Sequence, residues 1–103
     1  MESESAVESW LGRQLRQEGF MYFKFVSPQN PGVPDRLVIC PDGAVVFVEL
    51  KTATGRLSKR QQICIQDLMR HGQRVAVVHG MAEAKLVARL LIDKYGGGQG
   101  GKI

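Results

Sequence analysis

The run 44–50, which reads AVVFVEL, constrains the fold of this chain more than any other segment. A run that is nearly all apolar and rich in valine predicts a strand at the centre of a sheet, covered on both faces. Pro41-Asp42-Gly43, just before it, is a tight-turn signal, and the run 35–40 before the turn also has the composition of a strand. These two strands are therefore predicted to form an antiparallel hairpin.

Three helices and two further strands are predicted from the spacing of apolar residues and from stop signals. In the first and last parts of the chain, apolar side chains recur every three to four residues, which is typical of an amphipathic helix. Ser58 followed by Gln61 is a capping-box signal for a helix, and Gly72 is its stop signal. The predicted helices are 3–18, 58–71 and 81–95, and the further strands are 20–26 and 74–79.

The order of these elements, αβββαβα, predicts an α/β fold with a mixed four-stranded sheet flanked by helices. The strand 44–50, the helix 58–71 and the strand 74–79 form a βαβ crossover, so the two strands should be parallel neighbours with a right-handed connection. A chain of 103 residues has room for one core, and we expect a single domain over 1–95. The glycine-rich tail 96–103 is expected to be mobile.

Composition narrows the classes of function. The formal net charge is +4 and the pI is about 9.4, which favours an anionic partner such as nucleic acid. Cys40 and Cys64 belong to no CxxC motif or Cys/His cluster, so we expect reduced thiols in a cytoplasm rather than a zinc site. The chain has no run of about 18 apolar residues, and its acidic N-terminus does not fit a secretory signal, so no membrane span is expected.

Three charged residues are predicted to meet at one end of the hairpin. Asp35 opens the first strand and Glu49 ends the second, so antiparallel pairing brings the two carboxylates to the same end. Lys51 comes two residues after Glu49, and its side chain therefore leaves the same face of the strand. Leu50, between them, points to the other face.

A glutamate at the end of so apolar a strand needs a cation to offset its charge. The carboxylates of Asp35 and Glu49 and the backbone carbonyl of Leu50 form a hard oxygen set that suits Mg2+, with Mn2+ as a substitute. Such a metal can polarise a phosphodiester, which predicts hydrolysis of DNA. Lys51 could orient or deprotonate the attacking water, or neutralise charge on the phosphorane, and the sequence leaves these roles open. The competing interpretation is a solvated surface cluster, or carboxylates that hold only a stabilising ion.

The motifs around these residues resemble those of a known family. The three motifs are Gly32-Val-Pro-Asp-Arg36, Phe47-Val-Glu-Leu-Lys-Thr52 and Gly55-Arg-Leu-Ser-Lys-Arg-Gln61. Their order and spacing are similar to those of the VRR-NUC (virus-type replication-repair nuclease) family, within the PD-(D/E)xK superfamily, and the similarity extends from the first helix to about Val78. It implies a restriction-endonuclease-like fold, metal binding by Asp35 and Glu49, and catalytic roles for these two residues together with Lys51 and Gln61.

The resemblance carries further implications. An acidic residue of the first helix often joins the metal site in this superfamily; Glu8 is the best match and Glu4 is its competitor, four residues apart on one helical face. The resemblance also implies a structure-selective endonuclease for branched DNA such as Holliday junctions. It would act as a homodimer in phage replication, recombination or repair, in the cytoplasm of a bacterial host. The alternative is a non-catalytic module on the same fold that holds branched DNA for a partner.

Residues around the motifs have both structural and functional interpretations. Gln61 can complete the capping box with Ser58 and still act at the site. Positively charged side chains crowd the motifs and are predicted to contact DNA phosphates, although Lys24 could equally face solvent. They are Lys24, Arg36, Arg56, Lys59 and Arg60. We expect the aromatic residues to lie in the core rather than to stack on bases, and His71 and His79 to be structural.

Overall fold

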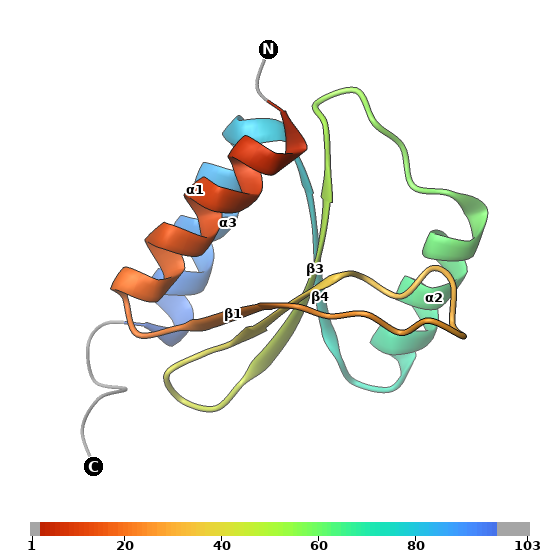
Figure 1. The fold of residues 1–103 in the computed structure, drawn as a ribbon. Helices are drawn as coiled ribbons and strands as arrows, with labels where there is room; N and C mark the ends of the chain where they lie inside the picture. The colour runs from red at the N-terminus through yellow and green to blue at the C-terminus, as the bar shows by residue number, and fades with distance from the viewer. Residues whose placement is uncertain (1–2, 97–103) are drawn as a thin grey trace.

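The computed structural model describes residues 3–96, in which a four-stranded sheet is flanked by three helices (Figure 1). The elements are α1 (Glu4–Gln17), β1 (Met21–Lys24), β2 (Arg36–Ile39), β3 (Val45–Lys51), α2 (Lys59–Arg70), β4 (Arg74–His79) and α3 (Gly80–Tyr95). The predicted order αβββαβα and the α/β class are confirmed. Among the described residues, no helix is long and apolar enough to cross a membrane. From residue 97 on, the predicted tail lies outside the described part of the chain.

The sheet has the order β1-β2-β3-β4 and contains both kinds of strand pairing. β1 with β2 and β2 with β3 are antiparallel, whereas β3 and β4 are parallel, as the predicted crossover through α2 requires. The turn between β2 and β3 is closed by the Gly43 N–H, which donates to the Cys40 carbonyl at 2.8 Å. The Asp42 side chain accepts from the Ala44 N–H at 2.9 Å. This turn fixes the register that places the site residues.

The core lies between the sheet and the helices α1 and α3, which cover the same face and pack against each other (Figure 1). Val7, Leu11 and Leu15 come one helical turn apart on α1 and are fully buried, which is why this segment forms a helix that docks on the sheet. The Ser3 side chain accepts a hydrogen bond from the Ala6 N–H and caps the first turn.

Of the helices in the described part of the chain, α2 alone lies on the opposite face of the sheet, over β4 (Figure 1). On this face, Met21 and Phe23 of β1 remain 51% and 43% exposed. Val45 and Phe47 of β3 are half-buried, so the predicted cover on both faces of this strand is only partial on this face. The physical reason is that one short helix lies over β4 and leaves β1 open.

The strands β1, β2 and β3 begin and end one or two residues away from the predicted bounds. β1 is shorter than the predicted 20–26, because after Lys24 only the Phe25 N–H still bonds to the neighbouring chain, at the Asp35 carbonyl 2.8 Å away. Beyond Phe25 the prolines of the 27–34 loop lead the chain out of the sheet. β3 continues to Lys51, because this residue remains in register with His79 of β4.

Candidate active site

The register of the β2–β3 hairpin brings two carboxylates together, as predicted. Arg36 pairs with Val48, so Asp35, just before β2, lies opposite Glu49. The backbone N–H of Asp35 donates a hydrogen bond to the Glu49 carboxylate. The two acidic side chains differ in exposure: that of Asp35 is 47% exposed and that of Glu49 only 8%. The pair therefore has one carboxylate at the surface and one below it.

Among residues 3–96, Glu49 is the one charged residue that is buried. Its loss of solvent raises the pKa of this carboxyl above its usual value, and the negative charge of Asp35 raises it further. The positive charge of Lys51 and the Asp35 N–H act in the opposite direction but do not cancel the rise. Glu4 of α1 also contributes negative charge that raises this pKa. The end of β3 is therefore a place where negative charge is in excess and a cation is favoured.

Two side chains engage the same oxygen of Glu49. Lys51 Nζ lies 3.7 Å from Glu49 Oε2, on the same face of β3. Gln61 Nε2 donates a hydrogen bond to Glu49 Oε2 at 3.1 Å. Lys51 is itself only 19% exposed, so its ammonium group is directed at the carboxylate rather than into bulk solvent.

Gln61 performs the structural and the site role at the same time. Its Oε1 accepts from the Ser58 N–H at 2.8 Å, and its own N–H donates to Ser58 Oγ at 3.1 Å, which completes the predicted capping box. The remaining amide group of the same side chain holds Glu49. The first turn of α2 is thus tied to the end of β3 through one glutamine.

Arg36 forms ion pairs within the protein, and its predicted contact with DNA stays a prediction. Its guanidinium lies 3.2 Å from Asp35 Oδ2 and 3.8 Å from Glu8 Oε2, and its side chain is only 15% exposed. It also donates to the Asp35 backbone carbonyl at 3.1 Å. Arg36 therefore orients Asp35, and it connects Glu8 of α1 to the site. Glu8 is linked to Asp35 through Arg36, whereas Glu4 acts on Glu49 through its charge.

The other four predicted phosphate contacts are exposed side chains around this centre. Lys24 ends β1, Arg56 lies in the loop after β3, and Lys59 and Arg60 begin α2. Within residues 3–96 none of these four cations forms an ion pair. They form a rim of free positive charge beside the carboxylates.

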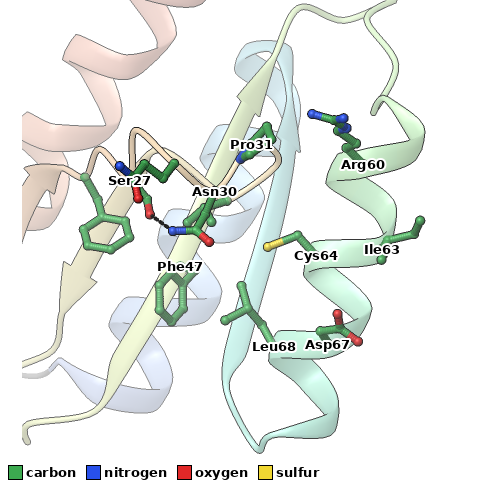
Figure 2. A pocket seen from close by; sticks show the side chains of 12 residues that line it. Ser27, Asn30, Pro31, Phe47, Arg60, Ile63, Cys64, Asp67 and Leu68 are labelled. Atoms are coloured by element: carbon green, nitrogen blue, oxygen red, sulfur yellow. Dashed lines mark hydrogen bonds between the residues drawn. The ribbon is translucent and has the colours of Figure 1, made fainter.

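A groove lies between the 27–34 loop and α2 (Figure 2). It has a volume of about 570 Å³, and Phe25 and Phe47 are among its aromatic lining. The loop approaches α2 closely at Gly32, where a Cβ would lie 2.6 Å from the Arg60 carbonyl oxygen, and its φ of +95° favours glycine. The sequence prediction placed the aromatic residues in the core and missed this groove. The sequence signal that could have indicated the groove is Phe47, because it comes two residues before Glu49 and therefore lies on the same face of the strand.

His79 and Glu83 form a pair near the end of β3, and His79 was predicted to be structural. His79 is in register with Lys51, and its ring Nδ1 lies 3.0 Å from Glu83 Oε1. Glu83 also accepts the His79 backbone N–H at 2.8 Å, and this hydrogen bond, followed by the one from the ring, lowers the pKa of Glu83. The pair fixes the start of α3 beside the site.

The donor groups at this centre fit a hard divalent cation. Among the described residues no three His, Cys, Asp or Glu side chains gather closely enough to hold a metal ion by themselves. A site here would therefore need Asp35, Glu49 and a backbone carbonyl, with solvent or substrate oxygens completing the shell. The raised pKa of Glu49 shows that the protein alone leaves its charge under-compensated, which is the condition that a cation would relieve.

Comparisons with known proteins find a matching family and similar folds. The family model described as "VRR-NUC domain" matches residues 3–82. The chain is 48% identical over 48 residues to the "Putative nuclease p44" of Acyrthosiphon pisum secondary endosymbiont phage 1, and this match spans 47% of the chain and 52% of that protein. The chain thus spans about half the length of this curated relative.

Two solved structures share the fold. One, described as "VRR_NUC domain", superimposes with a TM-score of 0.78 at 24% identity, over 84% of this chain and 94% of its own. A second, described as "VRR_NUC domain protein", gives a TM-score of 0.65 at 18% identity, over 87% of this chain and 84% of its own. At these identities the likeness confirms the fold alone, an α/β arrangement of a mixed four-stranded sheet with three helices.

Proposed function

The chain belongs to the VRR-NUC domain family, a family of nuclease domains, and from this premise we propose that it is a metal-dependent DNA endonuclease selective for branched DNA. The observation that carries the proposal is the buried Glu49 beside Asp35, with Lys51 and Gln61 directed at one of its oxygens. A protein that needed only stability would not keep this arrangement, because an apolar pair of similar size is usually no less stable.

Asp35, Glu49 and the Leu50 carbonyl would hold a Mg2+ ion, with Mn2+ as a substitute, and Glu8 or Glu4 would add negative charge from α1. When bound, the metal polarises the phosphodiester and stabilises the leaving oxygen. Arg36 fixes the direction of Asp35. Gln61 holds Glu49 Oε2, so this oxygen cannot rotate away. These contacts position the ligands before the substrate arrives.

Lys51 supplies a positive charge next to the reacting phosphate. Its Nζ lies 3.7 Å from Glu49 Oε2, so the ammonium form is paired at the site. In this form it can donate hydrogen bonds to a phosphate oxygen and stabilise negative charge in the transition state. The same position allows it to orient the attacking water. Both roles require the lysine at the end of β3.

The proposal of selectivity for branched DNA rests on how the positively charged side chains are distributed over the surface. Lys24, Arg56, Lys59 and Arg60 offer phosphate contacts from three different segments, and they suit a substrate with backbones in more than one direction. A homodimer would place two such centres about a two-fold axis, which matches the symmetry of a four-way junction. The phage relative supports a role in phage replication, recombination or repair within a bacterial cytoplasm.

The test is cleavage of labelled DNA of defined structure. A four-way junction, a flap and a linear duplex are each incubated with the protein in Mg2+, in Mn2+ and in EDTA. We expect metal-dependent cleavage with the junction or flap preferred, and a loss of about 100-fold or more for Asp35→Ala and Lys51→Ala. Lys85→Ala, an exposed lysine of α3, is the matched control and should cleave normally.

Three results would contradict the proposal in different ways. Cleavage that survives Asp35→Ala and Lys51→Ala would mean that the chemistry lies elsewhere. Binding of branched DNA without cleavage of any substrate would favour a non-catalytic binding module on the same fold. Light scattering that shows a monomer at working concentration would refute the homodimer.

A further inference from the structure

The groove between the 27–34 loop and α2 differs from the carboxylate centre, because most of its lining is apolar or aromatic and its one carboxylate, Asp67, is paired with Arg70. Phe25 and Phe47 meet edge to face, with ring centroids 6.0 Å apart and an interplanar angle of 74°. Ile63 of α2 is 50% exposed at the rim. Figure 2 shows Phe47 below the loop residues Ser27 and Asn30, with Cys64 and Leu68 of α2 across the opening.

The groove is continuous with the candidate active site. Phe47 precedes Glu49 by two residues on one strand face, so their side chains leave β3 about 7 Å apart. Arg60 lines the groove and directly precedes Gln61, which holds Glu49. A DNA strand whose phosphate lies at Glu49 would therefore pass this opening within a few nucleotides.

The chemistry of the groove matches an unpaired nucleobase. Bases stack on aromatic side chains regardless of sequence, and they form hydrogen bonds with polar groups at their edges. Asn30 Nδ2 donates to Ser27 Oγ at 2.9 Å, which leaves the Asn30 carbonyl oxygen as an acceptor, and Asp67 and Gln29 add further polar groups. The Arg60 guanidinium at the rim is free to bind the adjoining phosphate. The volume of about 570 Å³ is in the range of sites for small organic ligands, about 300–1,000 Å³.

We propose that this groove binds an unstacked base of the DNA strand, a few nucleotides from the phosphate that is cut. The proposal rests on the proposed nuclease function and deepens it, because it gives a physical origin for the preference for branched DNA. At a junction or flap some bases are already unpaired, and the energy needed to unstack one is small. In a continuous duplex every base must first be pulled out.

The experiment combines DNA lacking single bases with variants of one aromatic residue. A flap oligonucleotide is scanned with one abasic position at a time, and binding is measured by fluorescence anisotropy in EDTA. We expect the affinity of the wild-type protein to fall about tenfold at one or two neighbouring positions and to change little elsewhere. Phe25→Leu keeps the apolar bulk but removes the aromatic face, so this base-dependent loss should disappear, and Phe25→Tyr should restore it.

Phe23→Leu is the matched control, because Phe23 is an exposed aromatic residue on the same sheet face but does not line the groove. It should keep the full loss of affinity at the abasic positions. The proposal is overturned if no position shows a base-dependent loss, or if the loss persists in Phe25→Leu. It is also overturned if Phe25→Leu changes the association state in light scattering, because the groove would then be an interface between copies.

Cleavage of the same oligonucleotides in Mg2+ separates this proposal from the nuclease function. Cleavage without any base dependence would retain the nuclease and reject the base groove. A base-dependent affinity without cleavage would retain the base groove and reject the nuclease. Absence of binding to any of the DNA substrates would reject both.

Discussion

Glu49 is a charged side chain held away from water at the end of an apolar strand, and its cost to stability indicates its function. Burial and the neighbouring charge of Asp35 together raise its pKa, so the folded protein disfavours the ionised form. A position that disfavours a charge in this way is usually occupied by an uncharged amino acid. The retention of a carboxylate here agrees with a site in which activity requires a destabilising group.

The variant Glu49→Gln should therefore be more stable than the wild-type protein at pH 7 and inactive. Because the folded-state pKa of Glu49 lies above its unfolded-state value, the wild-type loses stability as pH rises through the interval between these two values. The glutamine variant should lack this loss. Urea unfolding at several pH values from 4 to 7, roughly the range in which carboxylates titrate, measures the difference.

Glu18→Gln is the control for removal of a charge, because Glu18 is an exposed residue at the end of α1. It should alter neither cleavage nor the pH dependence of unfolding. A Glu49→Gln protein that is less stable than the wild-type at pH 7 would show that the contacts of Lys51 and Gln61 outweigh the burial of the charge.

At the residue scale, the sequence could predict which side chains meet but not their individual partners. Strand alternation and one tight turn were sufficient to place Asp35, Glu49 and Lys51 together. Arg36 was predicted to contact DNA because it is a cation beside the motif. Its pairing with Asp35 and Glu8 depends on the packing of α1 against the sheet, which no local pattern of residues encodes.

At the element scale, the first turn of α2 is the part of the fold that links stability to the site. Ser58 and Gln61 close a capping box, and Gln61 alone also holds Glu49. The two residues can therefore be used to separate the helix cap from the contact with the carboxylate.

Ser58→Ala and Gln61→Ala should each cost about 1 kcal/mol of stability, because each removes one side-chain partner of the box. Ser58→Ala should retain most of the cleavage rate, since the amide of Gln61 still reaches Glu49. Gln61→Ala should lower the rate about tenfold or more, because the orientation of Glu49 is lost. Thermal unfolding and single-turnover cleavage measure the two effects. Equal rates for the two variants would mean that Gln61 acts only as a cap.

The 27–34 loop is held against α2 by a close approach that only glycine permits. Gly32→Ala should destabilise the protein by about 2 kcal/mol or more, because the new Cβ would lie 2.6 Å from the Arg60 carbonyl oxygen and the φ of +95° adds strain. Gly43→Ala is the matched control: its φ is +93°, but a Cβ there meets nothing within 4 Å. It should cost only about 1 kcal/mol. Equal losses of unfolding free energy would mean that the contact with α2 adds no cost.

The elements themselves were largely predictable, and the groove between them was not. Turn residues, glycine stops and apolar spacing are local signals, and they gave the order of helices and strands within one or two residues at most ends. The groove depends on the distance between the proline loop and α2. These two segments are separated in sequence by the strands that carry Asp35 and Glu49, so no local signal reports that distance. The open face beside β1 was missed for a similar reason, because the reach of α2 across the sheet is a tertiary property.

At the scale of the whole molecule, buried acids that stay neutral should make the fold sensitive to alkaline pH. Burial raises the pKa of Cys40 from 9.0 to about 11 and that of Tyr22 from 10.0 to about 12. In each case the unfolded state ionises first, so stability is complete below the unfolded-state pKa and falls as pH rises through the interval. Cys40 alone should account for a loss of about 2 kcal/mol between roughly pH 9 and pH 11.

Urea unfolding at intervals across this alkaline range should show the decline, and Cys40→Ala should make it less steep although the variant is less stable throughout. Cys64→Ala is the comparison: burial raises the pKa of Cys64 as well, but this thiol is only half-buried on α2, so its removal should change the steepness less than Cys40→Ala does. The same steepness in Cys40→Ala and in the wild-type protein would contradict the assignment.

The rim of free cations should control the salt dependence of DNA binding by the whole molecule. Each lysine or arginine that contacts a phosphate contributes about 0.9 to the slope of log affinity against log salt concentration on duplex DNA. Arg56 is exposed and unpaired within residues 3–96, so Arg56→Ala should reduce the slope by about this amount for all sequences alike. Lys85→Ala, on the far side of the sheet, should leave the slope unchanged.

Arg36→Gln should also leave this salt-dependence slope nearly unchanged while abolishing cleavage, because the charge of Arg36 is already paired with Asp35 and Glu8. If the slope fell equally in Arg36→Gln and Arg56→Ala, Arg36 would contact DNA directly and would not act mainly by orienting Asp35.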